Sequence, residues 1–540
     1  MHTDAQSLVA RGDRLFSKKL VLDSRNQDIA EHFYLERADF TVSRTLGTMW
    51  GEGNATGYPA LVHRDLSNSI GSMLRPKGKQ WMHIRAAREE NEDHDGKKWL
   101  EAATGLQRRA MEDRKALFSR ATSEGDKDFA AFGNAVISTE VNRRDTSLLY
   151  RCWHLRDCAW MHDSYGQMGE FHRNWKPTVS ELCEYFPGKV DPRTEEMKDR
   201  DPHALAHVRH VVIRTDAYTG KYRQPWVSMF IDCEHHHILE ERGSWTQIYT
   251  VPAWATVSGS QYGYSPAVTI ALPDARLIQA MTLSLLSAGE RAADPPMIGV
   301  QDALRSDLNL APGGFTAVDR DYDERLGEVL RPLNQDTSGL RFGMEMLDRT
   351  GGMLRSAFFL NVLSMPPVGG PDMTAYEFGQ RIQENIRQLL PLFGPMEDNY
   401  NGMVCEITFD TLMHENAFGP PESIPESIRG GDVQFVFESP LSQMVERQKG
   451  QTFIETKSML AQAVDVDPGV MEIVDFKTAL RDVLSGIGTP EKWLRSPDDV
   501  AKADAKAAQA ENAQQVLATM QQGADVAATL GQASQTLGPM

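Results

Sequence analysis

The sequence lacks the features that place a protein in a membrane or outside the cell. No uninterrupted apolar run approaches the roughly 18–20 residues that span a bilayer, so we expect no transmembrane helix. The first residues contain no apolar core of the kind that a secretory signal requires. Cysteine is scarce, and five residues, an odd number in a chain of 540, do not suit a disulfide framework. These absences favour a chain that is made in a reducing cytosol.

Motifs for nucleotide binding and for common hydrolytic chemistry are also missing. A P-loop needs Ser or Thr after its Gly-Lys pair, but the Gly-Lys pairs of this chain precede Gln, Lys, Val or Tyr. There is no strand-to-helix GxGxxG turn and no GxSxG nucleophile elbow, and His414-Glu415 lacks the second histidine of HExxH. We therefore expect neither an enzyme nor a bound cofactor.

Basic residues are fewer than acidic ones. The chain has 57 Lys and Arg and 75 Asp and Glu, which gives a formal net charge of −18. A protein that grips nucleic acid by neutralising phosphates presents a basic face, so a tight, static DNA binder is not expected. An acidic surface past which DNA slides is compatible with this charge, because like charge disfavours adhesion. The remaining composition, 41% hydrophobic and 24% charged, is that of an ordinary globular protein.

Two groups of cysteine and histidine could be interpreted as metal ligands. Cys233, His235 and His237 would share one face of a strand, since strand side chains alternate, and such a set could hold zinc. The simpler interpretation, which we favour, is a strand with a polar face and no metal. The second group has no CxxC spacing, and we expect no metal there either; it comprises Cys152, His154, Cys158 and His162.

Helix and strand signals occupy long blocks of the chain. Residues 1–125 show mainly helical spacing of apolar residues, and 128–260 are rich in short β-prone runs separated by turns. Long helices are predicted over 272–292 and over 338–363. Gly351-Gly352 falls inside the second of these helices and predicts a bend there.

The segment between the two long helices, 294–334, is acidic and rich in turns. It carries eight acids against four arginines, a net charge of −4, and has no helical or strand periodicity. We expect it at the surface. Two long helices around a compact insert suit an element that extends from a body and returns to it.

A loop of prolines and glycines, 366–372, gives way to a sharply defined helix start. Thr374 and Glu377 have the capping-box spacing, and Met373 and Phe378 bracket them at the hydrophobic-staple positions. Glycine supplies conformational freedom in the loop, and proline supplies stiffness. An ordinary connection between two helices is the simpler interpretation of this pattern.

The last hundred residues follow an expected strand within 433–441 and form another helical unit. From about residue 496 the chain is rich in Ala and Gln and poor in side chains that could be buried. A helix of this composition would either pack against copies of itself or fray, and the sequence leaves both open.

Five stretches resemble, in order, the portal or head-to-tail connector family of short-tailed bacteriophages. They are RDLSNSIGSMLRPKGKQWMHIR (64–85), MHDSYGQMGEFHRNWKPTVSELCEYF (161–186), YGYSPAVTIALPDARLIQAMTLSLLSAGERAADPP (262–296), PDMTAYE (371–377) and FESPLSQ (437–443). One such match alone would be weak, whereas five in the right order over about 380 residues make a specific signal.

The resemblance implies an α+β portal fold, mainly helical, with a β-rich wing lobe. Its parts would be the wing (1–260), a first stem helix (261–293), a clip (294–335), a second stem helix (336–364), a channel loop (365–373), a wing return (374–441) and C-terminal crown or barrel helices (442–540).

The resemblance also implies a ring, in the family a homododecamer, at one capsid vertex of the virion. The ring would assemble in the host cytoplasm, and double-stranded DNA would pass through it during packaging and ejection. The implied partners are further copies of the chain, the terminase large subunit, tail adaptor or nozzle proteins, and the major capsid and scaffolding proteins. No membrane is implied.

The resemblance places functional residues in two segments and implies no catalytic residue and no metal ligand. The channel loop, facing DNA, would be Pro366, Pro367, Val368, Gly369, Gly370, Pro371 and Asp372, followed by the loop–helix junction of Met373, Thr374, Glu377 and Phe378. The clip, docking terminase and tail proteins, would use Asp319, Arg320, Asp321, Asp323, Glu324 and Arg325. The alternatives are another head–tail adaptor or structural ring of a phage, and a metal-dependent enzyme.

Overall fold

The computed structural model describes most of the chain as far as Glu438 and short pieces beyond it. The described residues are 4–45, 47–48, 50–78, 80–88, 93–293, 297–299, 330–332, 338–363, 393–438, 453–460 and 475–486, with isolated positions at 295, 384, 387–388, 489, 493, 499–500, 502 and 506. The chain divides into two compact units, one of residues 1–81 and 106–419 and the other of residues 82–105 and 420–540.

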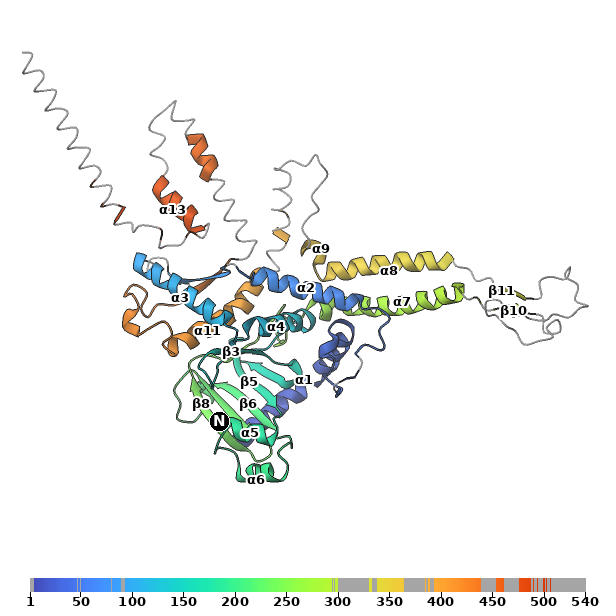
Figure 1. Cartoon of the computed structure of the whole chain (residues 1–540), viewed down its shortest axis with the longest axis horizontal. Helices are drawn as coiled ribbons and strands as arrows, with labels where there is room; N and C mark the ends of the chain where they lie inside the picture. Colours follow the sequence, from blue (N-terminus) through green and yellow to red (C-terminus); the bar gives the residue numbers. More distant parts are fainter. Residues whose placement is uncertain are drawn as a thin grey trace, which may run out of the picture. The chain divides into compact units, whose positions relative to one another are not determined.

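A five-stranded antiparallel sheet organises the first unit, in the order β4-β5-β6-β7-β8 (Figure 1). Its strands are Cys158–His162, Met168–Trp175, Val208–Arg214, Trp226–Asp232 and His237–Ser244. The central strands β6 and β7 pair without a register shift, from Val208 opposite Asp232 to Arg214 opposite Trp226. This sheet confirms the β-rich block that the sequence predicts.

Helices cover both faces of the five-stranded sheet. Val211 of β6 belongs to one core with Val9 of α1 (Ala5–Phe33). Val208 points to the opposite face and packs with apolar residues of α5 (Val179–Tyr185). Because both faces are buried, β6 does not alternate between apolar and polar residues, and Val211, Val212 and Ile213 follow one another directly.

Arg209 of β6 holds α1 close to the sheet through a hydrogen bond and an ion pair. A Cβ at Gly12 would lie 2.5 Å from Arg209 Nη1 and 2.7 Å from His172 Nδ1, so glycine is what allows the helix to approach this closely. The Arg209 guanidinium donates to the Val9 carbonyl at 2.8 Å and pairs with Asp13 at 2.9 Å. Helix α1 is therefore held by a charged anchor as well as by its apolar face.

A second, three-stranded sheet in the order β3-β2-β9 completes the first unit together with further helices. Its strands are Leu148–Cys152, Ile137–Val141 and Tyr249–Thr250, and the helices are α2 (Tyr58–Leu74), α4 (Phe118–Phe132), α6 (Pro192–Arg200) and α11 (Met403–His414). A hydrogen bond of 2.7 Å joins the hydroxyls of Tyr150 and Thr408 and links this sheet to α11.

The second unit contains an antiparallel pair of β1 (Met82–Ala86) and β12 (Val433–Phe437), which confirms the strand predicted near its start. Residues 94–105 of α3 (His94–Glu112) belong to the same unit, and the Thr104 hydroxyl accepts a hydrogen bond of 3.0 Å from the Ile84 amide. Helix α13 spans Phe476–Gly486. The Ala/Gln-rich segment beyond residue 506 lies outside the described residues.

Taken together, the helices and sheets confirm the predicted α+β class. All five cysteines are free thiols, as their number led us to expect. Within the described ranges, no helix is both long and apolar enough to cross a membrane.

His63 of α2 should make the fold sensitive to acid. Its side chain is buried, and its Nε2 lies 2.9 Å from the Lys127 carbonyl oxygen. Burial lowers the pKa of His63 to about 4, whereas a histidine in an unfolded chain titrates near about 6.5. Protons therefore bind the unfolded state preferentially between these two values, and this group should reduce the free energy of unfolding by about 3 kcal/mol as the pH falls from 7 to 4.

His63→Gln is the matched test, because a glutamine amide can donate to the same carbonyl without titrating. Urea titrations at pH 7 and pH 4 should show a smaller loss of stability in the variant than in the parent protein. Burial also lowers the pKa values of His172 and His210, but both proteins keep these residues. Equal losses in the two proteins would assign the acid sensitivity elsewhere.

Candidate functional site

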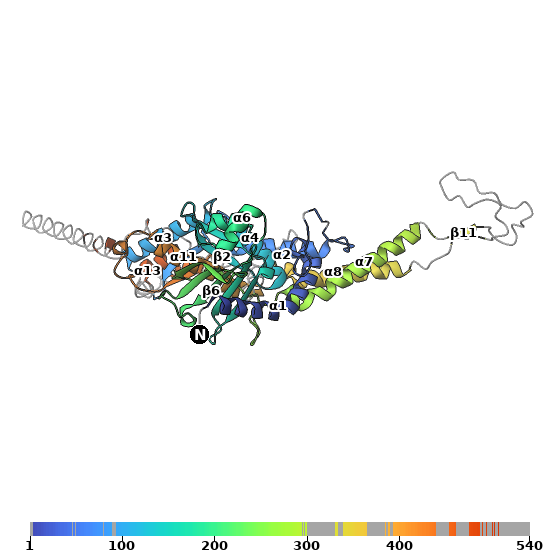
Figure 2. The same cartoon turned by 90° about the horizontal axis from the view of Figure 1, so that it is seen from below.

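Two long helices of the first unit, α7 (Leu272–Ala293) and α8 (Ser338–Ala357), lie side by side as a helical hairpin (Figures 1 and 2). The helix predicted over 272–292 is confirmed. Next to the hairpin, β10 (Met297–Gly299) pairs antiparallel with β11 (Leu330–Pro332). The sequence predicted no regular structure there, and strands of three residues are too short to give a periodic signal.

The second predicted helix, 338–363, is interrupted near its end. Helix α8 runs through Gly351 and Gly352, and the bend expected there stays a prediction. The interruption comes at Phe359, whose φ is 58°, before the short helix α9 (Leu360–Leu363). Gly351 has a different role, because the Tyr58 hydroxyl donates to its carbonyl at 3.1 Å.

Paired hydrogen bonds hold α7 to the segment before α2. Gln279 Nε2 donates to the Thr56 carbonyl at 2.7 Å, and the Thr56 amide donates back to Gln279 Oε1 at 3.0 Å. Arg276 forms an ion pair with Asp28 of α1. Burial lowers the pKa of the neighbouring His32, so this imidazole is neutral at pH 7 and leaves the ion pair undisturbed.

The two helices of the hairpin are in close contact at Gly343. A Cβ at this position would lie 2.7 Å from Leu285 Cδ2, closer than carbon atoms tolerate. On the same helix, a Cβ at Gly352 would meet nothing within 4 Å. Gly343 and Gly352 therefore offer a matched comparison of one crowded and one open position on the same helix.

We expect Gly343→Val to loosen the hairpin, because the added side chain must displace Leu285 or separate the helices, which costs about 1–3 kcal/mol. Amides of α7 and α8 should then exchange hydrogen about tenfold faster or more, measured by mass spectrometry. Gly352→Val carries the same change in helix propensity without the contact, and it should have a smaller effect. Adding Leu285→Ala should restore much of the protection in Gly343→Val, and equal behaviour of the two valine variants would contradict the steric account.

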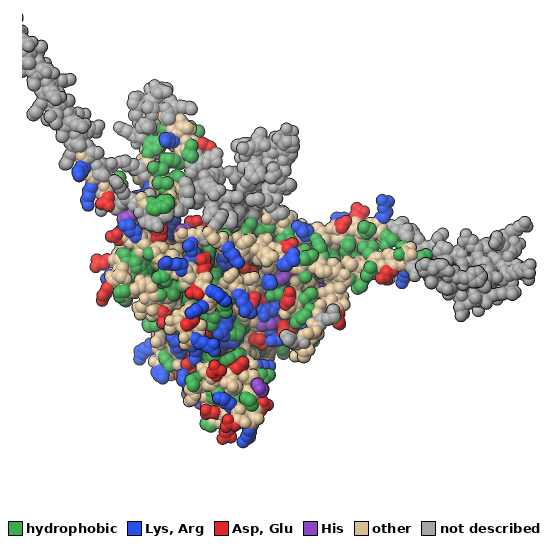
Figure 3. Space-filling view, in the orientation of Figure 1, with side chains coloured by type: hydrophobic (Ala, Val, Ile, Leu, Met, Phe, Trp, Pro, Cys, Tyr) green, Lys and Arg blue, Asp and Glu red, His purple; other side chains and the backbone are tan. Residues whose placement is uncertain are grey.

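Large apolar side chains remain exposed along the hairpin, and Figure 3 shows hydrophobic surface over α7 and α8. Large apolar side chains that a single chain leaves in water are candidates for contact with another protein surface. The exposed residues are Leu277, Leu283 and Leu286 on α7 and Phe342, Met344 and Met353 on α8. We call these six residues the hairpin patch.

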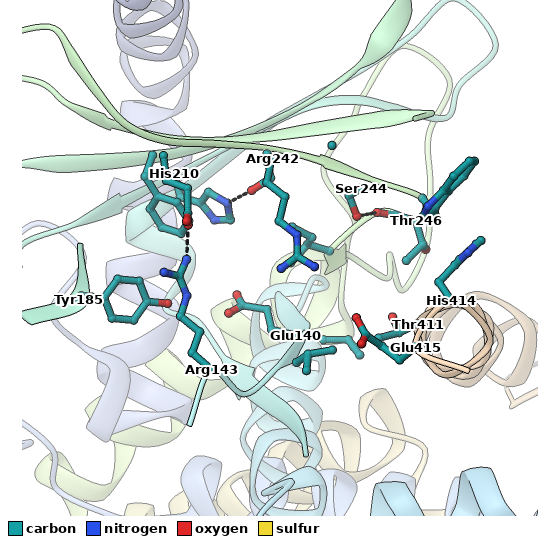
Figure 4. Close-up of a pocket in the computed structure, with 18 residues that line it drawn as sticks. Glu140, Arg143, Tyr185, His210, Arg242, Ser244, Thr246, Thr411, His414 and Glu415 are labelled. Atoms are coloured by element: carbon teal, nitrogen blue, oxygen red, sulfur yellow. Dashed lines mark hydrogen bonds and ion pairs between the residues drawn. The ribbon is translucent and has the colours of Figure 1, made fainter. Parts of the chain in front are cut away.

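A cavity of about 160 Å³ in the first unit is the other candidate site (Figure 4). Its walls come from β2, β6, β7, β8 and the C-terminal end of α11, and they combine charged and aromatic side chains. Arg143 forms an ion pair with Glu240, and Trp245 stacks on His414 with ring centroids 4.9 Å apart. Burial opposes ionisation of Glu240, but hydrogen bonds from Lys189 and Arg143 outweigh it and lower its pKa.

The polar groups at the base of this cavity do not form a catalytic triad. Ser228 Oγ lies 2.7 Å from His210 Nε2, which is the spacing of a nucleophile and its base. The other ring nitrogen of His210, however, contacts the Tyr249 hydroxyl instead of a carboxylate. His210 also lies 4.0 Å from the Phe230 ring, centroid to centroid, and is buried, so the arrangement supports the core of the sheet.

The sequence-predicted channel loop, loop–helix junction and clip residues all lie outside the described residues. They comprise Pro366 to Asp372, then Met373, Thr374, Glu377 and Phe378, and the six clip positions Asp319, Arg320, Asp321, Asp323, Glu324 and Arg325. The nearest described residues along the chain are β10 and β11 on either side of the clip positions, and Leu363 before the channel loop.

The strand predicted to carry Cys233, His235 and His237 on one face is wrong. Strand β7 ends at Asp232, and the chain reverses through a turn in which His236 has a φ of 52°. His235 Nδ1 lies 3.1 Å from Asp232 Oδ2, whereas His237 Nε2 lies 3.0 Å from the Lys189 carbonyl. The described residues contain no group of three or more His, Cys, Asp or Glu side chains that could hold a metal ion.

Sequence reasoning missed the contacts that hold the hairpin in place. The two hydrogen bonds between Gln279 and Thr56 join residues far apart in the chain, so no local sequence pattern indicates them. Gly343 and Gly351 did leave a signal, because glycine weakens a helix and is kept where another group must come close. We had interpreted Gly351 only as a weakness of the helix and had not singled out Gly343.

Comparison with known proteins gives three findings. A family model described as "bacteriophage head to tail connecting protein" matches residues 5–494. The "probable portal protein" of Bordetella phage BPP-1 is 25% identical over 493 residues, which cover 88% of this chain and 85% of that protein. Among solved structures, a chain of the virion of a native gene transfer agent particle matches at a TM-score of 0.37 and 10% identity, covering 75% of this chain and 86% of that one.

Proposed function

The chain belongs to the family of bacteriophage head-to-tail connecting proteins, and from this membership we propose that copies of it close into a ring at one vertex of the virion. It is a structural portal, or connector, protein of a phage particle, and the family is not a known class of enzyme. The ring would be a conduit for double-stranded DNA during packaging and ejection.

The structural observation that supports this proposal is the hairpin patch. Six large apolar side chains on two neighbouring helices gain free energy when copies cover them, at about 25 cal/mol per Å² of apolar surface removed from water. Another phage polypeptide could also cover the patch. Self-association is favoured because each copy presents two long helices of similar length, which can pack lengthwise on those of the next copy.

The contact between copies would be heterologous, with α7 of one copy against α8 of the next. Such a contact makes a closed ring when the rotation between copies divides a full turn, and an open filament when it does not. A dodecamer, as in the family, is the number that we propose. On this assignment α7 and α8 are the stem helices and lie around the channel.

The remaining parts of the chain extend the proposal. The wing would be residues 1–260 together with 374–441, the clip 294–335 and the crown or barrel 442–540. The clip, Asp319 to Arg325, would dock the terminase large subunit during packaging and tail adaptor or nozzle proteins afterwards, and the major capsid and scaffolding proteins would surround the ring. A net charge of −18 supports a conduit, because weak adhesion lets DNA move.

The test is the mass of the purified chain by light scattering, with negative-stain images of the same fractions. We expect a mass of many copies and particles with a central hole. A stable monomer that stays monomeric with scaffolding and capsid proteins present would contradict the ring.

For the channel loop, we propose that 366–372 forms a compliant collar against DNA. Replacing Gly369 and Gly370 by valine removes backbone freedom while leaving the loop length unchanged. Packaged DNA, measured by nuclease protection in an assembly reaction, should fall severalfold while rings still form. Alanine at Val368 is the matched control in the same loop. Normal packaging by the valine variant would remove this role from the loop.

A further inference from the structure

Helix α8 is the part of the hairpin that is turned away from the five-stranded sheet. In Figure 1, α7 lies on the sheet side of α8, and Arg276 of α7 forms an ion pair with Asp28 of α1. One side of α8 is buried or half-buried against this body of the first unit. Its residues recur every three or four positions, the spacing of a single helix face, and they are Gly343, Leu347, Thr350, Leu354 and Phe358.

The opposite side of α8 carries charged residues that are all exposed. Arg341, Asp348 and Arg355 recur every seven positions and therefore form one row along the helix. Glu345 and Arg349 lie next to this row. None of the five forms an ion pair with another residue in the described part of the chain, and Figure 3 shows side chains of both signs along this edge of the hairpin. We call these five residues the charged stripe.

Apolar residues of the hairpin patch lie on both flanks of the charged stripe. Phe342 and Met353 are eleven residues apart, about three turns, so they share one flank. Met344 follows Phe342 by about 200° around the helix axis and lies on the other flank. When neighbouring copies cover both flanks, the charged stripe between them stays in water. Because the sheet lies beyond α7, on the side away from the charged stripe, the stripe then faces the inside of the ring.

We propose that the charged stripe is the contact surface of the ring for the phosphate backbone of double-stranded DNA. This inference rests on the ring proposed above, in which α8 lies around the channel. Arginine pairs with phosphate through charge and hydrogen bonds, and such contacts do not depend on base sequence. Three arginines against two acids give the charged stripe a net charge of +1, in a chain whose net charge is −18. The two acids repel phosphates between the arginines, so no position holds the DNA tightly enough to stop it.

The length and chemistry of the charged stripe favour a duplex over a protein partner. Arg341 and Arg355 are 14 residues apart, about 21 Å along the helix axis. A duplex carries one negative charge per about 1.7 Å of its axis, so about 12 phosphates lie beside each stripe at any time. An acidic polypeptide is the competing occupant. It is disfavoured because the charged stripe offers no large apolar side chain as an anchor, whereas phosphates require only charge.

A photoreactive side chain at Gly352 provides the direct test. Gly352 lies between Asp348 and Arg355 on the same side of α8, and a Cβ there would meet nothing within 4 Å. In DNA-filled particles, benzoylphenylalanine in place of Gly352 should crosslink to DNA on irradiation. The same residue in place of Val21 of α1, which is 83% exposed, should not. Crosslinks from position 352 to another polypeptide instead of DNA, or none at all, would overturn the proposal.

Substitutions in the charged stripe test whether its charge acts on moving DNA. The readout is the residence time of a duplex that is driven through single rings held in a nanopore. Glutamine at all three arginines of the stripe should shorten the residence time severalfold and weaken its dependence on salt, because fewer phosphates are neutralised. Glu345→Gln combined with Asp348→Asn should lengthen it. Arg120→Gln on α4, outside the hairpin, is the control and should leave it unchanged.

Failure of the DNA contact and failure of the ring give different results. Light scattering should show rings for every stripe variant, because the charged stripe lies outside the contact between copies. Rings whose residence times are equal in the stripe variants and the parent protein would overturn the DNA contact alone. A parent protein that stays monomeric with scaffolding and capsid proteins present would overturn the ring, and with it the channel that this contact needs.

Discussion

Glutamate at both Leu283 and Phe342 should leave the chain folded but unable to form rings. These side chains are 52% and 67% exposed in the single chain, so charge there is hydrated and costs the monomer little. Covering the same sites in a ring would desolvate two carboxylates per copy. The ring would also lose the free energy of burying Leu283 and Phe342, about 1.5–3 kcal/mol for each side chain. The penalty recurs at every contact around the ring, and we expect sedimentation to show monomers.

The matched control for this variant is Val21→Glu, an exposed apolar residue of α1 outside the hairpin patch, at 83% exposure. It should form rings as the parent protein does, which would show that one more surface carboxylate is not itself disruptive. Circular dichroism should report the same helix content in all three proteins. Rings from the Leu283/Phe342 variant would place the contact between copies somewhere other than the hairpin patch.

The local patterns of the sequence predicted the helices of the hairpin well, because their apolar periodicity and their first-turn residues act over a few positions. Helix 272–292 was found at Leu272–Ala293. The same kind of reasoning failed at residues 233–236, where alternation suggested a strand and the chain instead reverses. A turn that includes a histidine in the left-handed region has no common sequence signal, because glycine or asparagine is the usual occupant.

The candidate site was predictable in outline but not in its contacts. Two long helices around an insert could be read from spacing, and the family resemblance gave them a role. Three features depend on how distant segments pack: the close contact at Gly343, the hydrogen bonds between Gln279 and Thr56, and the exposure of Phe342. Periodicity says which face of a helix is apolar, but it cannot say whether that face meets its own chain or another copy.

Removing the Arg75 guanidinium should destabilise the first unit more than any surface change. Arg75 follows α2 and forms an ion pair with Asp126 of α4, and both side chains are almost wholly buried. It also donates to Asn401 Oδ1 at 2.6 Å and lies over the Tyr400 ring at 4.8 Å. Arg75→Met keeps much of the packing but leaves Asp126 as a buried, uncompensated charge, which we expect to cost about 3–5 kcal/mol.

The pH dependence of this loss identifies its cause. Burial raises the pKa of Asp126, and Arg75 opposes that shift, so the pKa should rise further in Arg75→Met. A carboxyl whose folded pKa lies above its unfolded value binds its proton more tightly in the folded state, and stability then falls as the pH rises between the two values. The variant should therefore approach the parent protein's stability near pH 4 and differ most at pH 7, measured by urea titration.

Adding Asp126→Asn should recover most of the loss at pH 7, because it removes the unpaired charge. A loss that stays constant across this pH range and persists in the double variant would assign the effect to packing around Tyr400 instead of to the ion pair.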